Sequence, residues 1–120
     1  DGVRPFASAE MISRLYEVAE KEKAVVPVVD SVDSVRILSA DGENSQIDRR
    51  MVKLVQTPQV FDLELLKKSY SVGFIETFTD DASVVEYSGH KISLAEGCRE
   101  NIKITTPIDL AIAEYMLNAK

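Results

Sequence analysis

Apolar positions near the start of the chain follow a helical period and then merge into one continuous run. The helical set, with members three or four residues apart, comprises Met11, Ile12, Leu15, Val18 and Ala19. Ser8 precedes this set as a candidate N-cap. Residues 24–29 are almost all apolar and rich in valine, which is typical of a strand buried on both faces in a parallel sheet. A helix followed by such a strand indicates an α/β fold.

Residues 30–56 follow a different pattern. Two β-branched runs, 35–38 and 51–55, flank a polar segment containing Asp41-Gly42, which predicts a hairpin with a long loop. Basic residues are frequent in and beside these runs, at Arg36, Arg49, Arg50 and Lys53. This composition suits a projecting arm that packs on a partner better than a central strand. We therefore expect a β-arm at about residues 31–56 that serves dimerisation.

Local signals place the next elements. Asp62 can cap a helix that ends near Gly73, with Phe61 and Leu66 as a hydrophobic staple. The elements predicted after it are a short helix from Asp80-Asp81 to about Tyr87 and strands at 91–95 and 101–105. Two acids at a helix start are more often a cap than a metal site, so we interpret Asp80-Asp81 as structural.

The last helix has the clearest capping signals. Thr106 stands at the N-cap, Pro107 at the first helical position, and Asp109 completes an approximate capping box. One face carries Ile108, Ala111, Ile112, Tyr115 and Met116, widened by Leu110 and Leu117. We expect this helix to be well buried.

Composition narrows the class of protein. The 120 residues suffice for one ordinary domain, and 45% hydrophobic with 28% charged residues is typical of a globular protein. A net charge of -6 argues against long-range attraction to nucleic acid or anionic lipid, so a phosphate ligand needs a local cluster of Arg and Lys. Cys98 is the only cysteine, which favours a reducing compartment, and no apolar run approaches a membrane span. We expect a cytoplasmic protein.

Candidate chemistry is limited to a few residues. The sequence has no zinc-ligand spacing and no glycine-rich phosphate loop. Asp1 and Arg4 can form a solvated turn with a salt bridge, or Asp1 can contact a metal or a substrate hydroxyl at a strand end. Lys103 can face solvent, or it can stabilise charge on a transferring phosphoryl group. Cys98 has no activating motif around it and is read as a bystander thiol.

Taken in order, several segments resemble the second half of 2-C-methyl-D-erythritol 4-phosphate cytidylyltransferases. They are Asp1-Gly2-Val3-Arg4-Pro5, Pro27-Val28-Val29-Asp30-Ser31, Thr57-Pro58-Gln59-Val60-Phe61, Thr79-Asp80-Asp81-Ala82-Ser83, Glu96-Gly97 and Asn101-Ile102-Lys103-Ile104-Thr105. The resemblance covers essentially residues 1–120 and rests on the ordered set. It implies the C-terminal part of a Rossmann-like nucleotidyltransferase sheet with the arm projecting from it. Gly2-Val3 stands where the family more usually has two alanines, and the spacing from Asp1 to Arg4 is kept.

The resemblance also implies an activity. Such enzymes join CTP to methylerythritol phosphate in the non-mevalonate isoprenoid pathway and release pyrophosphate with the help of Mg²⁺. Ribitol 5-phosphate cytidylyltransferases are similar, so the acceptor stays open between the two sugar-alcohol phosphates. A non-catalytic dimerisation module is the alternative from a different class, and an acidic interaction domain of an unrelated α/β protein is a third.

Site residues follow from the same resemblance. Asp1 matches the aspartate near the metal and the sugar alcohol, Arg4 an acceptor-site arginine, and Lys103 the lysine that reaches the reacting phosphates. Arg49 matches the arm arginine that binds the acceptor phosphate across the dimer interface, with Thr57 beside it. The family threonine after Pro-Val-x-Asp corresponds to Ser31 or to Ser34; Ser34 is favoured because a basic residue follows two positions later.

The glycine-rich loop and lysine that hold the triphosphate in this family have no counterpart here. The chain also opens at Asp1 without an initiator Met, which suggests that position 1 is not the natural start. We therefore expect a C-terminal fragment of a single nucleotidyltransferase domain that does not turn over CTP alone. The exposed sheet edge left by such a truncation predicts tight self-association.

Overall fold

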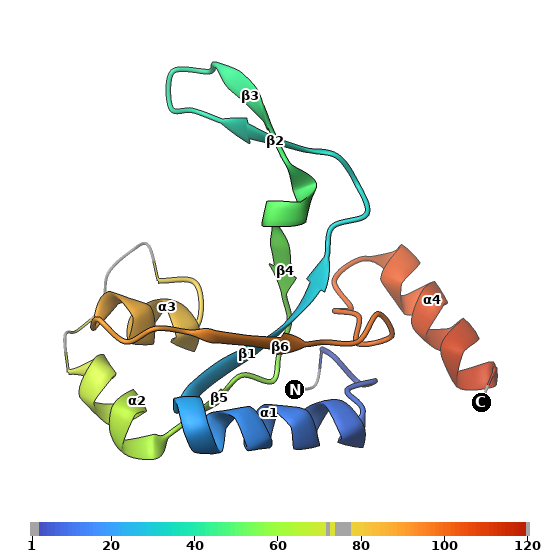
Figure 1. Cartoon of the computed structure of the whole chain (residues 1–120). Helices are drawn as coiled ribbons and strands as arrows, with labels where there is room; N and C mark the ends of the chain where they lie inside the picture. The colour runs from blue at the N-terminus through green and yellow to red at the C-terminus, as the bar shows by residue number, and fades with distance from the viewer. Residues whose placement is uncertain (1–2, 72, 74–77, 120) are drawn as a thin grey trace.

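The strand β1 (Ala24–Asp30) is the centre of the main sheet, and every other strand of that sheet pairs with it (Figure 1). The computed structural model describes residues 3–71, 73 and 78–119. β6 (Ser93–Glu96) pairs with β1 in parallel, whereas β4 (Lys53–Val55) and β5 (Val60–Phe61) pair with it antiparallel. Val25 and Val28 each pair with β6 and with one of the antiparallel strands, so β4 and β5 lie along the opposite edge of β1 from β6. The predicted α/β sheet is confirmed as a mixed sheet with one parallel pair.

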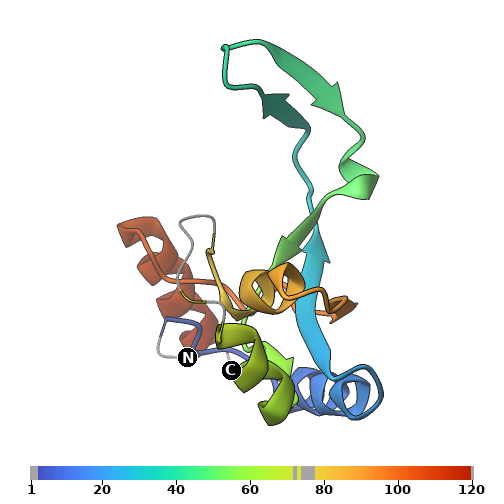
Figure 2. The same ribbon diagram turned by 90° about the vertical axis from the view of Figure 1, so that its left-hand side faces the viewer.

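Two helices cover opposite faces of β1. Met11 and Leu15 of α1 (Ala9–Glu22) form a buried core with Val25. The next residue, Val26, is also buried and lies on the side of Ala82 in α3 (Asp81–Tyr87). Successive side chains of a strand point to opposite faces, so α1 and α3 lie on either side of β1, as Figure 2 shows. This explains why residues 24–27 have no polar side chains: both faces are covered.

The predicted helix starts are confirmed. The Ser8 hydroxyl accepts a hydrogen bond from Met11 N at 3.1 Å, and the Asp62 carboxylate accepts one from Leu65 N at the start of α2 (Leu63–Tyr70), also at 3.1 Å. Thr106 forms a capping box with Asp109 at the start of α4 (Pro107–Asn118). Caps depend on residues only three positions apart, which is why they could be predicted. Within the described residues, none of the helices combines the length and apolar character that crossing a membrane requires.

The arm is present, but its predicted strand pairing was wrong. β2 (Val35–Leu38) pairs with β3 (Asn44–Ile47), which lies inside the polar segment that was expected to be a loop. The run at 51–55 instead supplies β4 of the main sheet, preceded by a 3₁₀ turn, η1 (Arg49–Met51). The Asp41-Gly42 turn, with Gly42 at φ +90°, allows the nearer pairing and a shorter hairpin. Figure 1 shows β2 and β3 projecting well beyond the sheet.

Two predictions near the C-terminus were also wrong. No strand forms at residues 101–105, where a backbone–backbone hydrogen bond, from Ile104 N to Val3 O, joins the described N-terminal segment in place of a ladder. α4 is not well buried: Ile108, Leu110, Ile112, Tyr115 and Leu117 are 43–74% exposed, and only Ala113 is fully buried. Figure 1 shows α4 standing apart from the sheet. Its apolar face has no covering element within the described residues.

Candidate functional site

The segments that carry Arg4 and Lys103 lie side by side, although they come from the two ends of the chain. Ile104 N donates to Val3 O at 2.8 Å, and Arg4 Nη1 donates to Asn101 O at 2.8 Å. Arg4 is half-buried, and this burial lowers the pKa of its guanidinium. Lys103 is exposed. The two joined segments thus form a surface beyond the carboxyl end of β6, the edge at which open α/β sheets bind ligands.

A buried pair of amide side chains holds this surface in place. Gln56 and Asn101 are 6% and 0% exposed. Asn101 Nδ2 donates to Gln56 Oε1 at 3.2 Å, and it also donates to Thr57 O at 2.8 Å. Gln56 in turn joins Cys98 through two hydrogen bonds: its Nε2 donates to Cys98 O at 2.9 Å, and its Oε1 accepts from Cys98 N at 3.2 Å. We call Gln56 and Asn101 the amide clasp; it joins the loop after β6 to the segment between β4 and β5.

The amide clasp also fixes Thr57, one of the predicted site residues. Thr57 is half-buried, and its carbonyl is held by Asn101 as just described. It precedes Pro58 through a cis peptide bond. Thr57, Arg4 and Lys103 are therefore all tied to the residues around Asn101, so three of the predicted site residues share one support.

Arg49 and the two candidate serines form a separate group at the arm. Arg49 lies in η1 and its Nη1 donates to Val32 O at 2.8 Å. Ser31 and Ser34 lie in two depressions that both include Arg49. Ser31 is half-buried and its hydroxyl donates to Asp33 O at 3.0 Å, whereas Ser34 is exposed. Each serine thus neighbours Arg49 on a different side.

The two groups belong to different parts of the chain. Arg49 lines two depressions at the arm, and Lys103 lines neither of these two. Arg49 lies in η1 at the base of the arm, whereas Lys103 lies between β6 and α4.

Asp1, the predicted metal and substrate contact, lies outside the described residues. Within the described part of the chain, no group of three or more His, Cys, Asp or Glu side chains could hold a metal ion. Asp80 caps α3 by accepting from Ser83 N at 2.9 Å, and it accepts from Gln59 Nε2 at 2.9 Å. Tyr70 donates its hydroxyl to Asp81. Asp80 is thus the cap of this helix, and Asp81 holds the Tyr70 hydroxyl.

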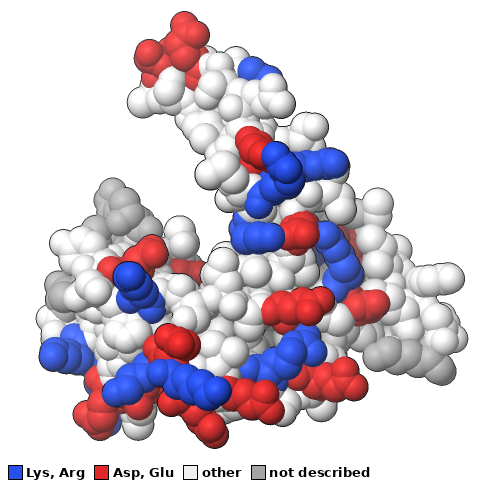
Figure 3. Space-filling model, viewed as in Figure 1, with Lys and Arg blue, Asp and Glu red and all other residues white. Residues whose placement is uncertain are grey.

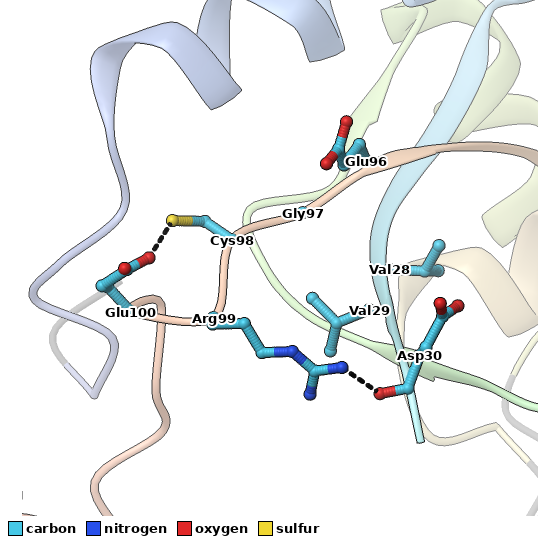
Figure 4. A pocket seen from close by; sticks show the side chains of 8 residues that line it. All are labelled: Val28, Val29, Asp30, Glu96, Gly97, Cys98, Arg99 and Glu100. Atoms are coloured by element: carbon cyan, nitrogen blue, oxygen red, sulfur yellow. Dashed lines mark hydrogen bonds between the residues drawn. The ribbon is translucent and has the colours of Figure 1, made fainter. Parts of the chain in front are cut away.

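The loop between β6 and Lys103 borders a depression with the end of β1 (Figure 4). Gly97 N donates to Val28 O at 2.8 Å, which continues the parallel pairing by one residue. Arg99 Nη2 donates to the carbonyl oxygen of Asp30 at 2.7 Å. Figure 4 shows the Arg99 side chain crossing the depression to reach that carbonyl. The loop thus touches both the amide clasp and the base of the arm.

Cys98 belongs to this loop. Its thiol donates to Glu100 Oε2 at 2.8 Å. That hydrogen bond and partial burial raise the pKa of the Cys98 thiol. A raised pKa leaves less of the reactive thiolate at neutral pH.

Sequence reasoning missed the amide clasp and Arg99. Gln56 precedes Thr57, and Asn101 lies in the segment of Lys103. Because Gln56 and Asn101 are 45 positions apart, the sequence could predict neither their burial nor their hydrogen bond. Arg99 gave no periodic or motif signal. The one hint to a role for Arg99 was the number of cations in the arm, which indicates an anionic ligand.

Comparisons with known proteins agree with the resemblance seen in the sequence. A family model for "IspD: 2-C-methyl-D-erythritol 4-phosphate cytidylyltransferase" matches residues 1–119. The chain is 57% identical over 117 residues to the 2-C-methyl-D-erythritol 4-phosphate cytidylyltransferase of Bacteroides thetaiotaomicron, and 55% identical over 117 residues to that of Bacteroides fragilis. Each alignment covers 98% of this chain and 53% of the relative. The chain therefore spans about half the length of the curated relatives it matches, and it aligns with their C-terminal half.

Solved structures give the same result for the fold. A 4-diphosphocytidyl-2C-methyl-D-erythritol synthase from Anaerococcus prevotii is 35% identical, with a TM-score of 0.88, over 98% of this chain and 56% of that one. The 2-C-methyl-D-erythritol 4-phosphate cytidylyltransferase of Thermus thermophilus is 32% identical, with a TM-score of 0.85, over 97% of this chain and 58% of that one. The fold described above is thus similar to one half of these enzymes.

Proposed function

Because the chain belongs to the 2-C-methyl-D-erythritol 4-phosphate cytidylyltransferase family, we propose that it is the acceptor-binding, C-terminal half of such an enzyme. The reaction transfers CMP from CTP to 2-C-methyl-D-erythritol 4-phosphate in isoprenoid precursor synthesis. An acceptor phosphate oxygen attacks the α-phosphorus of CTP, a new P–O bond forms, and the bond to pyrophosphate breaks. The single cysteine supports a cytoplasmic location for the reaction.

The observation that carries this proposal is the contact between the segments around Arg4 and Lys103. Two hydrogen bonds of 2.8 Å bring together residues about a hundred positions apart in sequence. Cations placed at the carboxyl edge of a sheet suit an anionic ligand. A pure pairing module has no need of this arrangement.

Each residue of this surface has a proposed role. Lys103 reaches the reacting phosphates and stabilises the negative charge that accumulates as pyrophosphate leaves. Arg4 binds the acceptor, and Asp1 contacts its hydroxyls. Thr57, held through the amide clasp, belongs to the same binding surface. Catalysis of phosphoryl transfer rests mainly on such positioning and charge neutralisation.

Arg49 acts in the site of a second subunit. The arm that carries it exposes apolar side chains, with Ile37 51%, Leu38 73% and Met51 78% exposed. Burying these side chains against another copy favours a homodimer. Arg49 then binds the acceptor phosphate across the interface, assisted by the hydroxyl of Ser31 or Ser34, both of which neighbour it.

Mg²⁺ is proposed as the divalent cation of the complete enzyme. The described residues do not include a group of three or more His, Cys, Asp or Glu side chains that could hold it, and the resemblance implies Asp1 as a ligand. Further ligands must then come from the nucleotide phosphates or from residues outside the described part of the chain. When bound, the ion would offset phosphate charge.

The test is to fuse the chain behind the N-terminal half of the Bacteroides thetaiotaomicron relative and to measure pyrophosphate release from CTP. Release with methylerythritol 4-phosphate, dependent on Mg²⁺, is the expected result. The chain without that half is expected to release none. Replacing Lys103 by Ala should lower kcat by about 10²-fold. Lys91→Ala, which removes an exposed lysine elsewhere, is the matched control and should leave kcat unchanged.

Equal activity of the Lys103→Ala and parent fusions would refute the assigned role, and release of pyrophosphate by the chain alone would refute the need for a second half. Ribitol 5-phosphate, assayed in parallel, distinguishes the second candidate acceptor: a higher kcat/KM with it would keep the mechanism and change the substrate. A fusion that folds and dimerises but is inactive with both acceptors would favour the non-catalytic dimerisation module.

A further inference from the structure

The arm leaves the main sheet after Asp30, the last residue of β1, and returns to it at Lys53, the first residue of β4. These two residues are paired across the β1–β4 ladder, and their side chains also form an ion pair. Within the described part of the chain, the side-chain hydrogen bonds of residues 31–52 all stay inside the arm. The direction of the arm relative to the sheet is therefore set at its base.

One side chain from a distant segment reaches this base. Arg99, in the loop after β6, donates from its Nη2 to the carbonyl oxygen of Asp30 at 2.7 Å, as Figure 4 shows. It also borders the depression that contains Arg49 and Lys53. Figure 3 shows blue and red side chains close together where the arm meets the rest of the molecule. Because the acceptor is a backbone group, Arg99 holds the main chain at the point where the arm begins.

The loop that carries Arg99 is itself firmly held. On one side of Arg99, Gly97 N donates to Val28 O at 2.8 Å, and on the other side Asn101 is completely buried. Cys98, next to Arg99 in sequence, is joined to the amide clasp by two hydrogen bonds. A guanidinium is planar and its donors have fixed directions, so one that projects from an anchored loop restricts where its acceptor can lie.

We propose that Arg99 is a positioning residue that sets the direction of the arm of its own chain and thereby acts on the site of a second copy. This inference rests on the proposed function, in which Arg49 of one arm acts in the site of the other copy. A small rotation of the backbone at Asp30 moves the whole arm, and Arg49 with it. Arg99 opposes that rotation and does not itself touch the ligand.

The loop after β6 would then serve two sites of the proposed homodimer. Arg99 precedes the buried Asn101 by two positions and Lys103 by four. Through the amide clasp, the loop supports the Lys103 segment of its own site, and through Arg99 it directs the arm toward the other site. A specific consequence follows: loss of Arg99 should impair the site that receives its arm and spare the site that contains its own Lys103.

The first experiment measures the direction of the arm in the chain itself. Residual dipolar couplings of backbone amides, recorded by NMR, give the orientation of β2 and β3 relative to α1 and β1. The Leu38→Asp background is used, because a charge among the exposed apolar side chains of the arm opposes pairing with a second copy. In this background Arg99→Ala should change or scale down the couplings of β2 and β3, whereas those of α1 and β1 should still fit the parent structure.

Two further variants serve as controls for this measurement. Arg99→Lys keeps a charged donor and loses the planar guanidinium, so its arm couplings should lie between those of Arg99→Ala and the parent. Arg36→Ala removes an exposed arginine whose side chain donates to Asn44 inside the hairpin, and it should leave the orientation of the arm unchanged. Unchanged arm couplings in Arg99→Ala, or an equal change in Arg36→Ala, would overturn the proposal.

The second experiment uses mixed dimers of the active fusion, purified through two different tags. One chain of each dimer carries Lys103→Ala, so the activity that remains reports on the site of the other chain. When Arg99→Ala is in the same chain as Lys103→Ala, the working site receives the arm that lacks Arg99, and its KM for the acceptor should rise by about fivefold to tenfold. When Arg99→Ala is in the other chain, the working site receives an intact arm, and this KM should not change.

The reference for both is a mixed dimer with Lys103→Ala alone, whose kcat and KM for CTP both arrangements should keep. A raised KM for the acceptor only when Arg99→Ala and Lys103→Ala are in different chains would mean that Arg99 acts in its own site, and it would overturn the proposal. Equal KM values in the two arrangements would overturn it as well. If the fusion is inactive, the proposed function fails, and the dipolar couplings alone decide whether Arg99 sets the direction of the arm.

Discussion

Replacing Gly97 by Ala tests how tightly the amide clasp is packed. A Cβ added at Gly97 would lie 2.5 Å from Gln56 Oε1 and 3.0 Å from Val28 O. The first distance is far below van der Waals contact, so Gln56 or the loop has to move. The side chain of Gln56 is 6% exposed and has no solvent-filled space to enter. Gly97 is therefore required here for the close approach of the loop to Gln56.

The cost of that movement follows from the hydrogen bonds that hold Gln56. Its Nε2 donates to Cys98 O, and its Oε1 accepts from Cys98 N and from Asn101 Nδ2. Inserting a methyl group into a packed interior costs about 1–3 kcal/mol. Each buried polar group left without its partner adds about 1–3 kcal/mol. If one of the three hydrogen bonds is lost, Gly97→Ala should lower the free energy of unfolding by about 3 kcal/mol.

Urea denaturation followed by circular dichroism measures this loss, and a double-mutant cycle assigns it. In the Gln56→Ala background the obstacle is absent, so Gly97→Ala should cost much less than in the parent. Gly42→Ala is the control: Gly42 has a φ of +90° and no atom within 4 Å of an added Cβ, so its cost arises from the backbone alone. That cost, about 1–2 kcal/mol, should be the same with and without Gln56. A stability of Gly97→Ala within about 0.5 kcal/mol of the parent, or additive effects in the cycle, would refute the reasoning.

Three further predictions concern stability, association and reactivity. Asn101→Asp should destabilise the chain by about 3 kcal/mol at neutral pH, because a buried carboxylate would face two oxygen acceptors. Burial should raise the pKa of the introduced carboxyl, so the loss should shrink as pH falls toward the unfolded-state pKa of about 4, which urea titrations at acid and neutral pH would show. Leu38→Asp should weaken self-association in sedimentation experiments at least about tenfold with little change in stability. Ser45→Asp, on the opposite strand, should change neither self-association nor stability. A monomeric parent would contradict the proposed arm interface. Cys98 should be alkylated several-fold more slowly than a free cysteine at mildly alkaline pH. Glu100→Gln should speed the reaction, because the Glu100 side chain is the main cause of the raised thiol pKa. An unchanged alkylation rate in Glu100→Gln would count against the hydrogen bond.

The sequence predicted those parts of the fold that depend on near neighbours. Helix starts at Ser8, Asp62 and Thr106 were right because capping involves residues three positions apart. The buried strand was right because both of its faces are covered, which leaves a continuous apolar run. The predicted pairing of the arm was wrong because two segments, β3 and β4, follow β2. Hydrophobicity favoured β4 as its partner, but β4 belongs to the main sheet and β2 pairs with β3.

Burial could not be predicted where it depends on a distant partner. α4 has an apolar face by any pattern analysis, yet that face is exposed because no described element covers it. Asn101 shows the converse: a polar residue in a segment expected to be a regular strand is completely buried, because Gln56 and Thr57 satisfy its amide nitrogen. The local sequence does not show whether another element covers the apolar face of α4, nor that Gln56 and Thr57 accept hydrogen bonds from Asn101.

The same distinction applies to the candidate site. Arg4, Lys103 and Arg49 were singled out by their segments, and the structure adds what supports the first two: the amide clasp, which holds the loop after β6. The loop is short and tied at both ends, since Gly97 bonds to Val28 and Asn101 to Thr57. Disturbing the amide clasp should therefore change acceptor binding and kcat together. The KM for the acceptor and the kcat of a Gln56→Ala fusion would test this, and an unchanged kcat in a folded Gln56→Ala fusion would show that the amide clasp does not position Lys103.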